Sequence, residues 1–96
     1  MPKGYWIAHV HASDPEEYKK YVEGARAAFL THDANFLARG GQYTELEGAQ
    51  GRERHVVIEF PSYQAALDCY HSEAYQSARA FRKEAGLATL LIVEGS

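Results

Sequence analysis

The chain has 96 residues, of which 46% are hydrophobic and 24% are charged, and its formal net charge is −3. This composition is typical of one folded globular domain spanning residues 1–96 and argues against disorder. There is no cluster of Lys and Arg and no apolar run near the about 20 residues that a membrane span needs, so neither a nucleic acid nor a membrane is expected as a partner.

The first element expected is a strand over residues 4–12, which are rich in aromatic and β-branched side chains. A helix is predicted to follow. Asp14 is suited to cap it, Pro15 suits its first position, and Glu17 is expected to complete a capping box. Apolar residues at helical spacing then predict that the helix continues to near His32.

A second strand is predicted over residues 35–39 and again over residues 42–47, with Gly40–Gly41 forming a bulge or bend between the two parts. Residues 48–53 are polar and contain two glycines, so they are expected to form a hairpin loop. Residues 54–60 carry the strongest strand pattern in the chain, and the proline that follows would end it.

Two short helical pieces and a last strand complete the predicted elements. Ser62 is suited to cap the first piece and Ser72 the second, while Gly86 is expected to end the second piece. Residues 87–94 are predicted as the final strand. The resulting βαββαβ order indicates an α+β, ferredoxin-like fold, with a four-stranded antiparallel sheet, helices on one face, and the first and third strands in the middle.

The two faces of this sheet differ in character, because side chains alternate along a strand. One set is purely apolar and should lie under the helices: Trp6, Ala8, Val10, Val56, Ile58 and Phe60. The opposite set is mixed: Tyr5, Ile7, His9, His11, His55, Val57 and Glu59, with Leu91 and Val93 from the last strand. An exposed patch with this much apolar surface usually marks a contact surface. We therefore expect a homodimer with its sheets packed face to face, the alternative being a monomer with an open sheet.

Several short segments occur in an order and spacing typical of one family. They are Gly4-Tyr5-Trp6-Ile7, Arg39-Gly40-Gly41, Val57-Ile58-Glu59-Phe60-Pro61-Ser62 and Tyr70-His71-Ser72-Glu73-Ala74-Tyr75-Gln76. On these segments the sequence resembles the DUF1330 family, a domain of unknown function in the dimeric α/β-barrel superfamily. The resemblance covers nearly the whole chain.

This resemblance implies a ferredoxin-like protomer and a homodimer whose two sheets form a barrel. It implies no established activity, since relatives in the superfamily include cofactor-free monooxygenases, muconolactone isomerase-like enzymes and haem proteins. A shared fold therefore does not assign the chemistry. Cys69 departs from the large aromatic residue typical of relatives, and a smaller side chain there would enlarge a cavity if the position lines one.

Arg39 and Glu59 are notable because both lie in strands otherwise suited to burial. Charged side chains are seldom buried unless they are paired. Two interpretations are open: an ion pair between the strands that fixes register, or a cleft beside both residues that takes an anionic ligand. In the second, Arg39 binds the anionic group through its guanidinium fork, and Glu59 or His9 is the catalytic residue that transfers a proton.

Tyr63, Tyr70 and Tyr75 cluster in the second helical region, with Trp6 expected beneath them. Such rings can form the wall of a ligand-binding site for a flat organic molecule, although the same periodicity is typical of a core. Together with Arg39, they favour a dimer that binds a small organic molecule, with cofactor-free catalysis left open. The alternative is a non-catalytic interaction module in which the sheet face serves only dimer contact.

Haem or metal binding is a weaker alternative. His9, His11, His55 and Glu59 share a face, and imidazole and carboxylate groups are metal ligands, but their spacing matches no known metal motif, so no metal and no cofactor are predicted. Cys69 is the only cysteine and is expected to be a packed thiol. A chain without an internal disulfide and without a signal peptide is expected in the cytoplasm.

Overall fold

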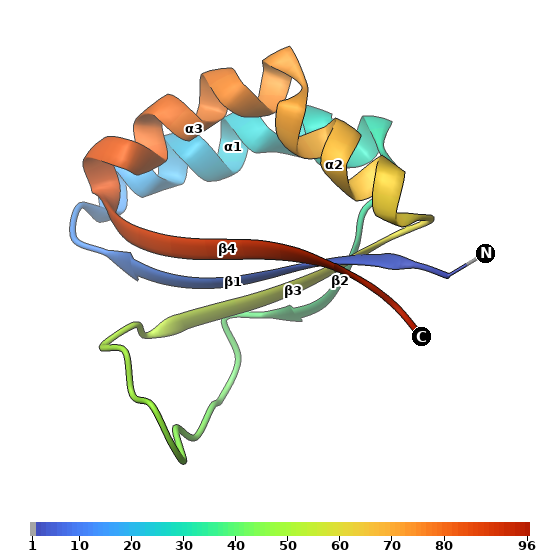
Figure 1. Cartoon of the computed structure of the whole chain (residues 1–96). Coiled ribbons are helices and arrows are strands. Elements are labelled where there is room, and N and C mark those ends of the chain that lie inside the picture. The colour runs from blue at the N-terminus through green and yellow to red at the C-terminus, as the bar shows by residue number, and fades with distance from the viewer. Residues whose placement is uncertain (1) are drawn as a thin grey trace.

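The computed structural model describes residues 2–96. Its elements are β1 (Gly4–Ala12), α1 (Pro15–Thr31), β2 (Asn35–Arg39), β3 (Arg54–Phe60), α2 (Tyr63–His71), α3 (Glu73–Ala85) and β4 (Gly86–Glu94). Figure 1 shows two layers, with all three helices over one face of the sheet and the other face uncovered. The strand order is β2-β3-β1-β4 and all neighbours are antiparallel, which confirms the predicted α+β, ferredoxin-like fold.

The strand register separates the two faces as predicted. Trp6 pairs with Ile58 on β3 and with Ile92 on β4, and these side chains lie under the helices. Tyr5 pairs with Glu59 and Val93, which therefore lie on the uncovered face of the sheet, called the open face below. The apolar residues expected beneath the helices form the floor of the core.

The start of α1 is capped on one side only. The Oδ1 atom of Asp14 accepts a hydrogen bond of 3.3 Å from the backbone N–H of Glu17, as expected of an N-cap. The Glu17 carboxylate, however, accepts from Lys20 at 2.9 Å, and the Asp14 N–H donates to the carbonyl oxygen of Ala85. The predicted capping box is therefore wrong in its second half, because the N–H that Glu17 would bind is already used by the end of α3.

β2 is shorter than predicted and its irregularity lies elsewhere. The strand ends at Arg39, and residues 42–47 form no strand but belong to a long loop that extends below the sheet in Figure 1. Gly40 has a φ of +68°, a conformation that favours glycine, and it directs the chain away from β3. The register shift falls between Phe36 and Ala38, so the bulge is at Leu37 and not at the glycine pair.

Hydroxyl caps divide the second helical region as predicted. Ser62 accepts a hydrogen bond from the N–H of Ala65 at the start of α2, and Ser72 accepts one from the N–H of Tyr75 at the start of α3. Gly86 follows α3 at a φ of +152°, and a Cβ atom there would collide with the carbonyl group of His11 on β1. Only glycine therefore fits the tight junction between α3 and β4.

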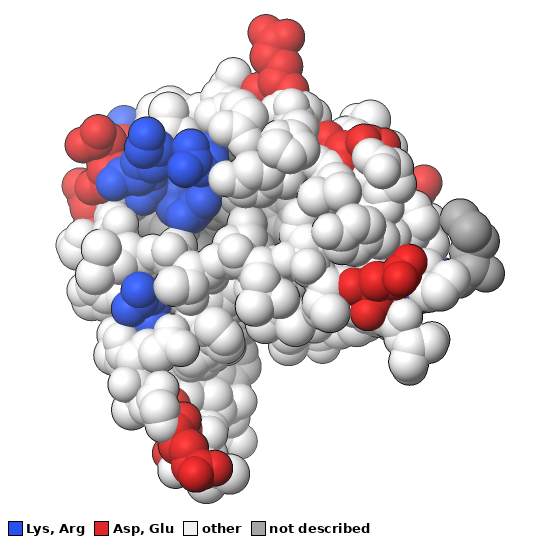
Figure 2. Space-filling view, in the orientation of Figure 1, with Lys and Arg blue, Asp and Glu red and all other residues white. Residues whose placement is uncertain are grey.

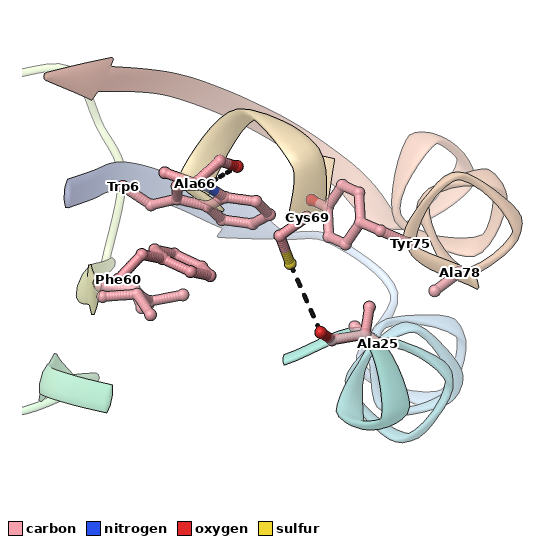
Figure 3. Close-up of a cluster of buried hydrophobic side chains, with 10 residues drawn as sticks. Trp6, Ala25, Phe60, Ala66, Cys69, Tyr75 and Ala78 are labelled. Carbon is pink, nitrogen blue, oxygen red and sulfur yellow. Dashed lines mark hydrogen bonds between the residues drawn. The ribbon is translucent and has the colours of Figure 1, made fainter. Parts of the chain in front are cut away.

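Trp6 lies at the centre of the core and is 2% exposed. Its ring packs against Tyr75 from α3 and Phe29 from α1, at centroid distances of 4.9 and 5.4 Å, and its indole N–H donates to the carbonyl oxygen of Ala66 at 2.9 Å (Figure 3). This one side chain thus joins the sheet to all three helices. Within residues 2–96 no helix has the length and apolar character needed to cross a membrane.

Candidate functional site

A cavity of about 50 Å³ lies between the sheet and the helices, and we call it the helix–sheet cavity. Its floor includes Trp6, Ala8, Val56 and Leu90 from β1, β3 and β4, and its roof includes Tyr18, Tyr21, Phe29 and Tyr75 from α1 and α3. One water molecule needs about 10–15 Å³ measured in this way, so the cavity has room for several waters or for a small organic group. Its walls are mainly apolar and aromatic, as in many ligand sites.

Three arginines from three different elements also line this cavity: Arg39 from β2, Arg54 from β3 and Arg82 from α3. Each guanidinium carbon lies over an aromatic ring, and the distances to the ring centroids are 4.3 Å for Arg39 and Phe36, 5.6 Å for Arg54 and Tyr18, and 5.5 Å for Arg82 and Tyr21. Stacking on a ring restrains the planar group and leaves its N–H donors at the edge. The three guanidinium groups are therefore restrained by aromatic rings at the edge of the same cavity.

Figure 2 shows how charge is distributed around this part of the molecule. Basic side chains gather beside a hollow in the face shown, over the end where α3 runs into β4, and acidic side chains adjoin their outer edge. A second basic group lies below the hollow. The chain as a whole carries a formal charge of −3. The positive charge here is therefore a local feature, opposite in sign to the protein as a whole.

Two tyrosine hydroxyls are close together at the cavity. The hydroxyl oxygens of Tyr21 and Tyr75 lie 3.0 Å apart, within hydrogen-bonding distance. Burial, together with the neighbouring Tyr75, raises the pKa of Tyr21 well above its ordinary value of 10.0. The Tyr21 hydroxyl consequently stays protonated, and the cavity lining contributed by residues 2–96 contains arginines and tyrosines but no carboxylate.

The structure does not bring Arg39 and Glu59 together. Arg39 pairs with Val56, whose side chain faces the helices, whereas Glu59 lies on the open face and accepts a hydrogen bond of 3.3 Å from the Tyr5 hydroxyl. Without the extra residue at Leu37, Arg39 would pair with the β3 residue next to Val56, and its side chain would lie on the same face as that of Glu59. The predicted ion pair and the predicted common cleft are therefore both wrong.

His9 also lies on the open face, away from Arg39. Its Nδ1 atom is 2.7 Å from the Nδ1 atom of His55, so one ring donates the shared proton and the other accepts it. The Tyr43 ring packs on His55 at a centroid distance of 4.4 Å. Tyr43 and His55 also line a surface hollow under the long loop. The two residues predicted to be catalytic thus share the open face, and neither lines the helix–sheet cavity.

The aromatic residues predicted to bind a ligand divide into two groups. Trp6 and Tyr75 line the helix–sheet cavity. Tyr70 packs edge-on against Trp6 at 6.1 Å but lines a separate surface hollow together with Tyr63, which is 39% exposed. The predicted single wall of tyrosines is therefore only partly present, since α2 ends at His71 and α3, which begins after the Ser72 cap, carries Tyr75 in a different direction.

Arg54, Arg82 and Tyr21 are cavity residues that the sequence reasoning did not identify as a site, yet the sequence contains a signal for each arginine. Arg54 precedes Val56, Ile58 and Phe60 at a spacing of two, so alternation places a charged group on an otherwise apolar face. Arg82 continues the buried stripe of α3 formed by Tyr75, Ala78 and Ala85. A charged residue in a stripe that is otherwise buried indicates a ligand-binding candidate.

The remaining candidates do not assemble into a metal site or a nucleophile. Within the described residues no three His, Cys, Asp or Glu side chains lie close enough to hold a metal ion. The Nδ1 atom of His11 lies 2.9 Å from Glu53 Oε2, so His11 bonds to Glu53 and is not part of the His9–His55 pair. Cys69 is buried between α2 and α1, where burial raises the pKa of its thiol to about 12, and it does not line the helix–sheet cavity (Figure 3).

Solved structures share this architecture at low sequence identity. A protein of unknown function from Rhodopseudomonas palustris has a TM-score of 0.76 at 18% identity, over 99% of this chain and 83% of that one. SnoaB from Streptomyces nogalater, a cofactor-independent oxygenase, has a TM-score of 0.62 at 12% identity, over 100% and 95%. A dimeric protein of unknown function with a ferredoxin-like fold, from Bacteroides fragilis, has a TM-score of 0.60 at 12% identity, over 96% and 95%.

These similarities establish the fold and leave the activity open, because unrelated functions share this architecture. No curated protein matches the sequence. A family model does match it, over residues 3–96, and its description is a domain of unknown function, DUF1330. The match takes in β1 through β4 and every residue of the helix–sheet cavity. The chain therefore belongs to the DUF1330 family.

Proposed function

We propose that this protein binds a small organic molecule with an anionic group in the helix–sheet cavity. Arg39, Arg54 and Arg82 bind the anionic group, and Trp6 and Tyr75 contact the apolar part of the molecule. The observation that carries this proposal is an apolar, aromatic cavity to which residues 2–96 contribute guanidinium groups and no carboxylate. Sites of this composition hold organic anions because the walls exclude water while the forked donors match carboxylate oxygens.

We further propose that the binding unit is a homodimer formed through the open face. Leu91 and Val93 on β4 are exposed there, beside the partly buried Ile7 and Val57. An apolar surface of this kind is typical of a contact face. The existence of solved dimeric proteins with the same fold supports this arrangement.

Benzoate is a suitable first probe, because it combines a carboxylate with a ring. We expect it to shift the amide resonances of cavity residues on α1, β3 and α3 in ¹H–¹⁵N spectra. Ala88→Leu, which fills part of the cavity, should abolish these shifts. Ala80→Leu is the matched control, since Ala80 is an exposed position of α3. Shifts confined to the open face, or none at all, would place the ligand elsewhere and overturn the proposal.

A second candidate is catalysis at the open face, with Glu59 and His9 as proton-transferring residues. The observation that favours it is the close His9–His55 pair beside the hollow under the long loop. In this case a substrate would bind between the two sheets of the dimer, and His9→Gln would change its turnover while Ala88→Leu would not. If the dimer forms and no ligand binds to either face, the protein is a non-catalytic interaction module.

A further inference from the structure

We infer that the ligand of the helix–sheet cavity is a small dianion, which is either a phosphate compound or a dicarboxylate. This inference rests on the proposed function and narrows its ligand class. It begins with the balance of charge among the residues that line the cavity. Three of them are arginines, of which Arg54 and Arg82 are half-buried and Arg39 is exposed, and none of the lining residues in the described chain, 2–96, is Asp or Glu.

No ion pair elsewhere neutralises these arginines. Within residues 2–96 the ion pairs closer than 4.0 Å join His11 to Glu53 and Lys20 to Glu17, and neither includes a cavity arginine. Glu53 is the acidic residue that shares a neighbouring surface hollow with Arg54. Its carboxylate already accepts from His11 at 2.9 Å and from the backbone N–H of Ala12 at 3.0 Å. Within the described residues the cavity arginines are therefore not paired with a carboxylate, and a bound anion would be their first charged partner.

Arg54 combines an unused donor with a confined position at the cavity. Its Nε atom is buried and has no hydrogen-bond partner within residues 2–96, although buried donors are normally paired; the Nε atoms of Arg52 and Arg79, outside the cavity, are likewise without a partner there. The guanidinium is held between the ring of Tyr18 and the backbone of Gly40, where a Cβ atom would lie 2.7 Å from its Nη1 atom. The group is thus confined by its neighbours while a buried donor remains unused, as expected if an anion completes its bonding.

The number of donors indicates more than one negative charge. A guanidinium has five N–H donors and commonly binds two oxygens side by side, so one carboxylate group saturates a single fork. Three forks lining one cavity favour an acceptor with three or more charged oxygens. A phosphate group offers these on one atom and a short dicarboxylate offers them at two ends, and both match the small cavity volume.

Trp6 allows a direct measurement, because it is the only tryptophan in the chain and it lines the cavity. Its fluorescence is followed during titration with inorganic phosphate, sulfate, succinate, acetate and nitrate, at constant pH and ionic strength. We expect at least one of the dianions to bind about tenfold more tightly than acetate or nitrate, the effect of one further charge-assisted hydrogen bond. Phosphate and sulfate ahead of succinate would indicate a phosphate compound, and the reverse order a dicarboxylate.

The other outcomes separate this inference from the proposed function. If acetate or nitrate binds as tightly as every dianion, the inference of a dianionic ligand is wrong, and the cavity is a site for singly charged molecules. The same conclusion follows if benzoate binds in the cavity and no dianion does. If neither benzoate nor any of these anions reaches the cavity, both the inference and the proposed function are wrong.

Matched variants test whether the cavity arginines carry the effect. Arg54→Gln and Arg82→Gln should each weaken binding of the preferred dianion about tenfold. Lys83→Gln is the control, since Lys83 is the next residue of α3, carries the same charge and does not line the cavity. Circular dichroism confirms that each variant is folded. Equal weakening by Lys83→Gln and Arg82→Gln would assign the binding to general surface charge and contradict the inference.

Discussion

Arg39 and Glu59 lie on neighbouring strands but on opposite faces of the sheet, because Arg39 pairs with Val56 after the bulge at Leu37, whereas Glu59 pairs with Asn35 before it. The sheet separates the two charges, so they should contribute to stability independently. In a double-mutant cycle with Arg39→Ala and Glu59→Ala, we expect a coupling energy below about 0.5 kcal/mol in urea unfolding. A cycle of Tyr5→Phe with Glu59→Ala is the comparison, because the Tyr5 hydroxyl donates to Glu59 at 3.3 Å and these two should be coupled. A large coupling between Arg39 and Glu59 would contradict the register.

Gly4 and Gly41 should respond differently to the same substitution. A Cβ atom at Gly4 would lie 2.5 Å from the carbonyl oxygen of Ser62 and 2.7 Å from the Cα atom of Tyr63, which are backbone atoms that cannot move aside easily. Gly4→Ala is therefore expected to lower the free energy of unfolding by about 1–3 kcal/mol. Gly41 has no atom within 4 Å of such a Cβ and has no positive φ, so Gly41→Ala should be neutral or stabilise by up to about 1 kcal/mol. Urea unfolding of the two variants gives the comparison, and equal effects would argue against the close junction between β1 and α2.

Glu53 should make the stability of the protein depend on acid pH. Hydrogen bonds from His11 and from the backbone of Ala12 lower its pKa from the ordinary value of 4.5 to about 2. Because the folded-state pKa is the lower one, the ionised carboxylate stabilises the fold above pH 4.5, and this contribution is lost as the pH falls from about 4.5 to about 2. Glu53→Gln should therefore be less stable than the wild type at pH 6, with the difference closing towards pH 2. Glu47→Gln, at an exposed loop position, controls for the change in net charge, and a difference that persists at pH 2 would exclude this mechanism.

Cys69 should be inert in the folded protein. Its thiol is fully buried, donates weakly to the carbonyl oxygen of Ala28 at 3.7 Å, and has a pKa raised by burial to about 12. Thiolate is the reactive form, so we expect no labelling by a disulfide reagent at pH 8 in native buffer and complete labelling in concentrated urea. Labelling in native buffer at the rate of a free thiol would show that α2 opens or that Cys69 is accessible.

Leu91 tests the proposed homodimer. It lies on the open face and is 56% exposed in the single chain. Leu91→Glu would place a charge within the apolar contact, so sedimentation should show a dimer for the wild type and a monomer for the variant. Leu30 is a control of the same residue type, 74% exposed at the end of α1 on the helix side, and Leu30→Glu should remain dimeric. A Leu91→Glu variant that stays dimeric would remove the open face as the interface.

Much of the fold followed from local patterns in the sequence. Alternation along residues 4–12 and 54–60 predicted which side chains lie under the helices, and serine and aspartate caps marked where α1, α2 and α3 begin. These predictions succeeded because they depend on interactions within a few residues. Gly86 was likewise recognisable as the end of a helix, although its close approach to β1 became visible only in the structure.

The site depended on relationships that no local pattern contains. One extra residue at Leu37 moves Arg39 from the open face to the helix side, and the position of a bulge is decided by how two strands pack, not by the residues of one strand. The same holds for the three cavity arginines, which come from β2, β3 and α3 and meet only after the crossovers have brought these elements together. The sequence therefore indicated the elements, their buried faces and the family, whereas the tertiary packing alone brought the arginines and tyrosines around one cavity and left Glu59 and His9 on the other side of the sheet.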